Sequence, residues 1–208
     1  VPAVFAQGQG GLLDIALSPD FAETGVLYLG YADRVGRGEA RSAVARARLA
    51  GNRLVDVETI FRQAPAVRGG RHFGLRIVPA PDGTLFIGMG DRGLKDPAQD
   101  LDTTIGKVVR IHPDGSVPVD NPFIGRRGAL PEIFSYGHRN IQGAGLDAQG
   151  RFWTVEHGPR GGDALHRPQP GANYGWPLYS EGVAYSGAAI YAQEPPEGVV
   201  PPIHYWVP

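Results

Sequence analysis

Residues 75–90 read LRIVPAPDGTLFIGMG, two short apolar runs joined by a turn at Asp82 and Gly83. The first run has the composition of a short strand, and the second is a strand-like run that carries the aromatic residue Phe86. Apolar runs of about five residues on either side of an Asp-Gly turn are typical of a β-hairpin. This stretch therefore predicts two antiparallel strands joined by a tight turn.

The same shape occurs twice more in the chain. Residues 13–31 and residues 145–156 each contain a short apolar run, a turn around Asp or Gly, and a second run with an aromatic residue. The aromatic residues Tyr28, Phe86 and Trp153 hold equivalent places and are spaced about 60 residues apart. The chain is therefore predicted to repeat one hairpin-based unit.

Further strand-like runs lie between the hairpins, at residues 42–49 and 107–112. Four short strands in roughly 60 residues are the pattern of a β-propeller blade, somewhat longer than common blade repeats. We predict an all-β fold, a single partial β-propeller domain over residues 1–208 of a six-bladed ring. A β-sandwich with long loops is the alternative fold.

The length raises the question of ring closure. At about 60 residues per unit, 208 residues make about three and a half blades, whereas propellers close with about four to eight. A half ring on its own would expose unpaired strand edges. We therefore expect the chain to be the middle portion of a longer protein and to lack a bound cofactor and activity when isolated.

The composition limits the classes of function. The chain has 20 Lys and Arg and 21 Asp and Glu, so its net charge does not favour binding to nucleic acid or to an anionic membrane surface. No run approaches the ~18 apolar residues of a membrane span. The 31 Gly and 19 Pro favour short elements and tight turns over helices. The absence of cysteine excludes disulfides, thiolate metal sites and cysteine catalysis.

Seven short motifs then occur in a fixed order along the chain. They are QGGLL at 9–13, GDRG at 90–93, GKV at 106–108, DNP at 120–122, YGHRN at 136–140, EHGP at 156–159 and NYGWP at 173–177. Together they resemble the soluble glucose/sorbosone (aldose sugar) dehydrogenases that use pyrroloquinoline quinone (PQQ). The resemblance implies a six-bladed propeller that binds cofactor and sugar at the mouth of its central channel.

The resemblance assigns a catalytic pair. His72 stands four residues before Arg76, as the catalytic base does in this family, and Asp91 matches its acidic partner. Imidazole suits the task because its ordinary pKa of ~6.5 allows proton transfer near neutral pH. A carboxylate on the far ring nitrogen would fix the tautomer and stabilise the imidazolium.

The resemblance also assigns the cofactor contacts. Arg139 and Asn140 match quinone-binding residues, and Gln9 matches a cofactor-contacting amide. A planar guanidinium suits the carboxylates and quinone oxygens of PQQ, and Arg139 would also stabilise negative charge during reduction, which gives it a catalytic role. Trp206 resembles the start of another cofactor-contacting segment.

Calcium is the metal that the resemblance implies. Gly158 and Pro159 match the cofactor calcium site, where main-chain carbonyls bind the ion. Asp163 and Tyr174 match a structural calcium site, from which this sequence departs because Ala164 stands where an acidic residue is common. His157 and His166 are interpreted as surface loop residues, since neither has a partner at metal-ligand spacing.

The implied reaction is oxidation of an aldose at C1 to a lactone. His72 takes the C1 hydroxyl proton, hydride passes to the quinone, and an external electron acceptor reoxidises the cofactor. The family implies a periplasmic or secreted location, and a homodimer is one candidate assembly. The alternative functions are a non-catalytic extracellular binding module of the same fold and, ranked below it, a propeller lactonase with a carboxylate-ligated calcium ion.

Overall fold

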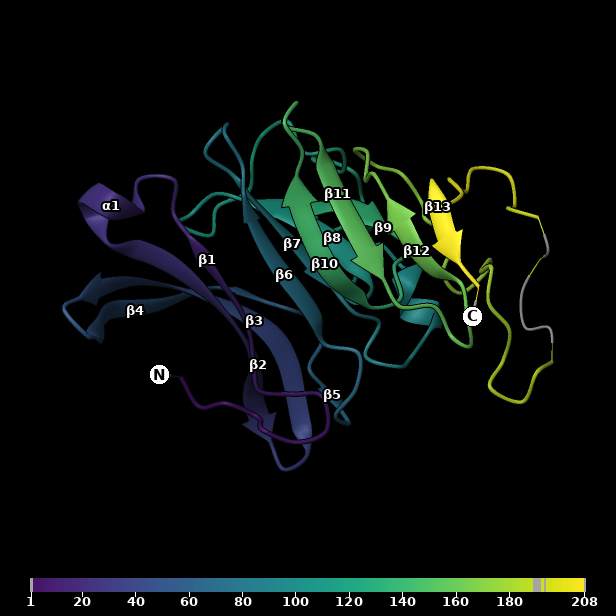
Figure 1. Ribbon diagram of the computed structural model, residues 1–208, viewed down its shortest axis with the longest axis horizontal. Coiled ribbons are helices and arrows are strands. Elements are labelled where there is room, and N and C mark those ends of the chain that lie inside the picture. Colours follow the sequence, from purple (N-terminus) through teal and green to yellow (C-terminus); the bar gives the residue numbers. More distant parts are fainter. Residues whose placement is uncertain (1, 189–191, 193, 208) are drawn as a thin grey trace.

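The computed structural model describes residues 2–188, 192 and 194–207 of the chain. Within these ranges the protein is all-β, with three antiparallel sheets and only two short helices, α1 (Phe21–Thr24) and η1 (Asp96–Ala98). The three sheets lie side by side in chain order, so that the N-terminus and the C-terminus are at opposite ends of the molecule (Figure 1). The predicted all-β class is confirmed.

Each sheet is built around a four-stranded meander. The first contains β1 (Leu12–Leu17), β2 (Val26–Gly36), β3 (Glu39–Ala50) and β4 (Arg53–Arg62), with β5 (Val67–Arg68) paired to β3. The second contains β6 (Gly74–Pro79), β7 (Leu85–Met89), β8 (Lys107–Ile111) and β9 (Ile133–Tyr136). The third contains β10 (Ile141–Leu146), β11 (Phe152–Glu156), β12 (Asp163–His166) and β13 (His204–Trp206).

The three predicted hairpins are present as β1–β2, β6–β7 and β10–β11. In two of them the turn is closed by an aspartate that accepts a hydrogen bond from a backbone N–H two residues later. Asp82 Oδ1 accepts from Thr84 N at 3.0 Å, and Asp147 Oδ1 accepts from Gln149 N at 2.9 Å. Such aspartates close turns because the short side chain reaches the backbone just ahead of it.

The described strands all belong to these three sheets, whereas the sequence predicted about three and a half blades. The difference arises in residues 167–203, whose described residues contain no strand. After them the chain forms β13, which is the fourth strand of the third sheet. Strand β13 is thus the last strand of the third sheet and does not begin another.

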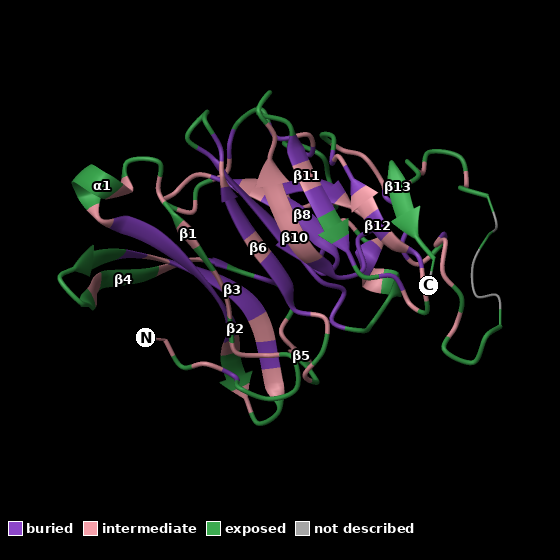
Figure 2. Cartoon of the chain, viewed as in Figure 1, coloured by how far each residue is buried: buried purple, intermediate pink, exposed green. Residues whose placement is uncertain are grey.

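The core lies between neighbouring sheets, where the strands β2, β3, β6 and β7 are mostly buried (Figure 2). Between the second and third sheets, the rings of Phe86 and Phe152 stack with centroids 4.5 Å apart, and Phe134 meets Phe86 edge-on at 4.9 Å. Contacts of this kind stabilise the sheets face to face beyond the area they bury.

The first strands of the three sheets, β1, β6 and β10, meet at Arg76. Its Nε donates to Gln142 O at 2.7 Å, and its Nη1 donates to Leu13 O at 3.1 Å. One side chain of β6 therefore ties together the backbones of both neighbouring sheets. This end of the strands carries the loops that contain the predicted site.

Candidate active site

The predicted catalytic pair is in contact in the structure. His72 lies in the loop before β6, and Asp91 follows β7. His72 Nδ1 lies 2.7 Å from Asp91 Oδ1, and the Asp91 side chain is fully buried while that of His72 is 14% exposed. A buried carboxylate on Nδ1 leaves Nε2 available to exchange a proton with a substrate.

Three further contacts hold Asp91. Its Oδ1 accepts from the backbone N–H of Gly93 at 2.7 Å, and its Oδ2 accepts from Trp176 Nε1 at 2.7 Å. Its own N–H donates to Arg139 O at 2.8 Å. Both carboxylate oxygens and the backbone of Asp91 are therefore held in place, and Asp91 positions the His72 imidazole in turn.

The backbone at His72 is also held in an unusual conformation. Its φ angle is 53°, in the left-handed region that residues with a side chain rarely adopt. Its N–H donates to Gln9 Oε1 at 2.6 Å, and its carbonyl oxygen would lie 2.0 Å from a Cβ at Gly90, so only glycine fits there. Strained backbone of this kind persists where several surrounding contacts hold it in place, and it is common at functional sites.

Arg139 and Asn140 directly precede β10, beside this pair. The guanidinium of Arg139 donates from Nη1 to His157 O at 3.0 Å and lies over the Trp176 ring, 5.1 Å from its centre. Arg139 Nε is buried and has no hydrogen-bond partner among the described residues. Buried donors normally have partners, so this unpaired donor fits an incoming ligand oxygen.

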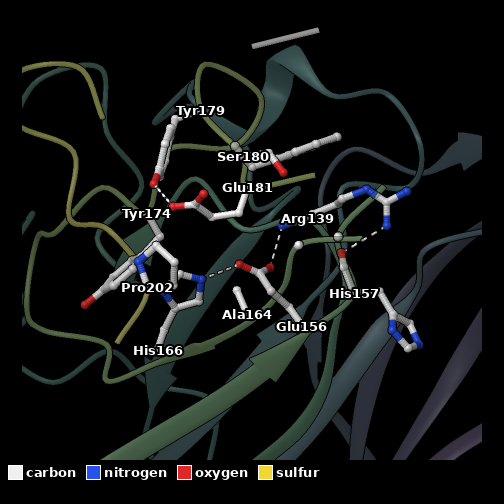
Figure 3. A pocket seen from close by; sticks show the side chains of 13 residues that line it. Arg139, Glu156, His157, Ala164, His166, Tyr174, Tyr179, Ser180, Glu181 and Pro202 are labelled. Atoms are coloured by element: carbon white, nitrogen blue, oxygen red, sulfur yellow. Dashed lines mark hydrogen bonds and ion pairs between the residues drawn. The ribbon is translucent and has the colours of Figure 1, made fainter. Parts of the chain in front are cut away.

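Glu156 is a site residue that the sequence analysis did not single out. Its Oε2 accepts the backbone N–H of Arg139 at 2.6 Å and that of Asn140 at 3.3 Å, and its Oε1 lies 2.9 Å from His166 Nε2 (Figure 3). Burial raises the pKa of Glu156, but the contacts with His138 and His166 outweigh it and hold this pKa well below its usual value. The ionised carboxylate therefore positions both predicted cofactor-binding residues.

The interpretation of His166 as a surface residue is wrong. His166 lies on β12, is 3% exposed and pairs with Glu156, because its strand turns this side chain inward. His157 is exposed as expected, with its Nδ1 3.1 Å from Asp163 Oδ2. Glu156 and Trp176 both stand in motifs that carried the resemblance, so the sequence did contain a signal for them.

Besides the smaller pocket of about 30 Å³ that Arg139 and Glu156 line (Figure 3), two larger pockets adjoin these residues. One, of about 200 Å³, is lined by His72, Asp91, Arg139, Pro159 and Trp176, among others. The second, of about 310 Å³, is lined by residues that include Gln9, Asn140 and His157. The predicted catalytic residues His72, Asp91 and Arg139 therefore line one pocket, and the predicted cofactor contacts Gln9 and Asn140 line the other.

The predicted metal-binding residues lie next to these pockets. The carbonyl oxygens of Gly158 and Pro159 accept no hydrogen bond from the described residues, which leaves them available as calcium ligands. The Asp163 carboxylate instead accepts from Gly158 N at 2.9 Å, and the Tyr174 hydroxyl donates to Arg167 O at 2.8 Å. In the described part of the chain, no group of three or more His, Asp or Glu side chains is arranged to hold a metal ion.

Trp206 is the one predicted cofactor contact that lies apart from both pockets. It is on β13, its side chain is exposed, and its carbonyl accepts from Gly162 N at 2.9 Å. Its role as a cofactor contact stays a prediction.

Taken together, the fold and site define an all-β protein in which a buried aspartate holds a histidine, beside an arginine whose Nε has no hydrogen-bond partner among the described residues. The family profile described as "Glucose / Sorbosone dehydrogenase" matches residues 1–208. The chain belongs to the glucose/sorbosone dehydrogenase family.

Individual relatives agree with this assignment. The chain is 46% identical over 211 residues to the aldose sugar dehydrogenase YliI of Escherichia coli, covering 99% of this chain and 57% of that protein. A crystal structure of a glucose dehydrogenase matches with a TM-score of 0.95 at 46% identity, over 99% of this chain and 61% of the other. The PQQ-bound aldose sugar dehydrogenase of Streptomyces coelicolor matches with a TM-score of 0.79 at 33% identity, over 100% of this chain and 57% of the other.

The chain therefore spans less than two thirds of the length of these relatives. In the part of the chain that the structure describes, no helix is long and apolar enough to cross a membrane.

Proposed function

We propose that the protein carrying this chain is a quinoprotein oxidoreductase that oxidises the C1 hydroxyl of aldose sugars to lactones with PQQ as cofactor. The observation that carries the proposal is the 2.7 Å contact between His72 and buried Asp91, in a pocket that Arg139 also lines. The PQQ-bound state of the Streptomyces coelicolor relative supports the choice of cofactor.

In this proposal His72 is the general base. Its Nε2 takes the proton from the C1 hydroxyl while Asp91, held by Gly93 and Trp176, stabilises the resulting imidazolium. PQQ, when bound, supplies the acceptor for the hydride that leaves C1. Because the pair is preformed and Asp91 is fully buried, the base needs little reorganisation when the sugar binds.

The residues present fit a cofactor rich in carboxylate and carbonyl oxygens. Arg139 has a buried donor without a partner among the described residues, and Asn140 and Gln9 add amide groups at the second pocket. These donors suit such oxygens because charge-assisted hydrogen bonds are stronger than neutral ones. Arg139 would also stabilise negative charge that develops on the cofactor.

Calcium is proposed at the free carbonyls of Gly158 and Pro159, which hard cations accept as ligands. The described residues fit a structural calcium site at Asp163 and Tyr174 poorly, because both side-chain oxygens are engaged and Ala164 offers none. We retain calcium only for the cofactor site.

A non-catalytic binding module is the alternative from another class. It predicts that His72, Asp91, Arg139 and Asn140 are scattered, whereas the structure brings them together, which favours the enzyme. A periplasmic or secreted location, a six-bladed ring, an external electron acceptor and a homodimer complete the proposal.

The test is reconstitution of the complete protein that carries this chain. It is incubated with PQQ and calcium, and dye reduction is measured with several aldoses against samples that lack the quinone or the calcium. Quinone-dependent turnover with at least one aldose is the expected result. No quinone-dependent turnover with any aldose would reject the enzyme and favour the binding module.

A further inference from the structure

The pocket beside His72 has an excess of positive charge that the proposed reaction does not use. Arg71 and Lys95 line this pocket together with Arg139. Among the described residues neither Arg71 nor Lys95 forms an ion pair or a side-chain hydrogen bond. The one carboxylate among the described lining residues, Asp91, is buried and committed to His72, Gly93 and Trp176. The two exposed cations therefore have no anionic partner among the residues that the structure describes.

Lys95 is held at the pocket by a strained turn. Its backbone has φ 68° and ψ −82°, and the N–H of Asp96 donates across it to Leu94 O at 3.0 Å, which makes a rare three-residue turn. The turn is anchored on both sides. Leu94 N donates to Asp91 O at 2.9 Å, and the carbonyl of Ala98 accepts from buried Lys107 Nζ at 3.1 Å. The strain persists because these contacts over-determine the position of Lys95.

Arg71 packs against Gly93, which lies between Asp91 and this turn. A Cβ on Gly93 would lie 3.0 Å from Arg71 Cδ, so the aliphatic part of Arg71 packs along a residue that has no side chain. Gly93 has a φ angle of 77°, which further favours glycine. The turn that fixes Asp91 therefore also brings both cations to the pocket.

We propose that this pocket prefers an anionic aldose, a sugar that carries a carboxylate or phosphate group in addition to its C1 hydroxyl. This inference rests on the proposed function: with the C1 hydroxyl at His72, the anionic group would meet Arg71 and Lys95. Charge attraction is effective here because no described residue forms an ion pair with either cation. The aromatic side chains of Trp176 and Tyr185 line the same pocket and offer apolar faces to the sugar ring.

The position of the two cations favours the sugar over the cofactor as their partner. Two predicted cofactor contacts, Gln9 and Asn140, line the neighbouring pocket, from whose lining Arg71 and Lys95 are absent, whereas Arg139 lines the pocket of the two cations. Arg71 and Lys95 instead lie on the side of His72 and Asp91 where the reacting hydroxyl is proposed to bind.

The experiment compares kcat/KM for glucose, glucuronate and glucose 6-phosphate in the complete protein loaded with PQQ and calcium. The variants are Arg71→Gln and Lys95→Gln, and Arg53→Gln is the matched control because Arg53 is exposed on β4, outside this pocket. We expect at least one anionic sugar to exceed glucose. Each pocket variant should lower that ratio by about 3- to 10-fold, with glucose itself changed less than about twofold.

Carboxylate and phosphate are distinguished by which anionic sugar shows the larger ratio in the unmodified protein. Added salt should reduce the preference because these cations are exposed. Arg53→Gln should leave every ratio unchanged. Equal or better turnover of glucose, together with unchanged ratios in both variants, overturns the inference.

Two further readouts separate the possible failures. If either variant weakens the PQQ titration while the sugar ratios stay unchanged, the cations serve the cofactor and the inference is wrong. If no sugar is oxidised at all, the proposed function fails. Calorimetric titration with glucuronate, glucose 6-phosphate and glucose then still tests the charge preference, which equal or absent binding would overturn.

Discussion

Two aspartate turns in the second sheet have the same local structure and different surroundings. Asp82 and Asp91 each accept a hydrogen bond from the backbone N–H two residues later, at 3.0 Å from Thr84 and 2.7 Å from Gly93. The Asp82 side chain is 50% exposed and meets Arg110, whereas the Asp91 side chain is fully buried. Local sequence thus suffices for the turn, and burial beside His72 and Trp176 makes one of the two turns a site.

The largest effect is expected when His72, which the buried Asp91 holds, is replaced. In the reconstituted protein, His72→Ala should lower kcat by roughly 10²- to 10⁴-fold, because a positioned general base is lost. Cofactor binding should be largely retained. The matched control is His112→Ala, since His112 lies next to β8 and away from both site pockets. Normal kcat in the His72 variant would remove this residue from the mechanism.

The second largest effect is expected when the negative charge of Glu156 is removed. Glu156→Gln should lower the free energy of unfolding by ~2 kcal/mol, because a buried carboxylate that accepts hydrogen bonds from two backbone N–H groups is replaced by a neutral amide. Chemical denaturation with circular dichroism measures the loss. The substitution should also weaken the PQQ titration, since Glu156 holds the backbones of Arg139 and Asn140.

The pH dependence of stability follows from the same residue. The pKa of Glu156 is lowered in the folded protein from 4.5, so the folded state binds this proton less readily than the unfolded state. Its stabilising contribution is therefore fully present above pH ~4.5 and is lost as the pH falls below that value. Denaturation curves at pH values from 3 to 7 should show that the free energy of unfolding falls less steeply with decreasing pH in Glu156→Gln than in the unmodified protein. The same pH dependence in both proteins would contradict a lowered pKa for Glu156.

A smaller effect is expected when Asp91 loses one donor. Trp176→Phe removes the 2.7 Å hydrogen bond to Asp91 Oδ2 and keeps an aromatic ring beside Arg139. We expect kcat to fall about tenfold, the usual size of one charge-assisted hydrogen bond. A fall as large as that of His72→Ala would indicate that the indole itself takes part in the reaction. Unchanged kcat would show that Gly93 and His72 hold Asp91 sufficiently.

The smallest effect is expected at the exposed turn. Asp82→Ala removes the side-chain hydrogen bonds to Thr84 and the ion pair with Arg110, which is 2.8 Å long. Because Asp82 is half exposed, the free energy of unfolding should change by less than ~1 kcal/mol, and kcat should not change. Thermal denaturation and dye reduction measure the two quantities. Loss of activity would mean that the two turns are not independent.

The hairpins were predictable because their causes are local. Asp-Gly turns between short apolar runs determine where the chain reverses, and the aromatic residues repeat at the spacing of the sheets. The strands at 42–49 and 107–112 were found for the same reason. The fourth strand of the third sheet was not, since β13 joins β12 across residues 167–203, and no local pattern records that pairing.

His72, Asp91, Arg139 and Asn140 were identified because they stand in motifs that resemble a family, and not because their local patterns are distinctive. Glu156 and Trp176 were missed as site residues although the same motifs contain them. Their roles depend on contacts over long sequence separations, 85 residues in the case of Trp176 and Asp91. His166 was placed on the surface because an inward-facing strand position cannot be distinguished from a loop in a segment of four residues.

The turns, strands and all-β class of this protein are properties of short segments, since each follows from torsional preferences and side-chain periodicity within a few residues. The tertiary structure decided which aspartate is buried, which histidine it contacts and which cations lie beside them at the pocket. Those outcomes depend on desolvation and charge, and both are determined by groups that come together only when the sheets pack.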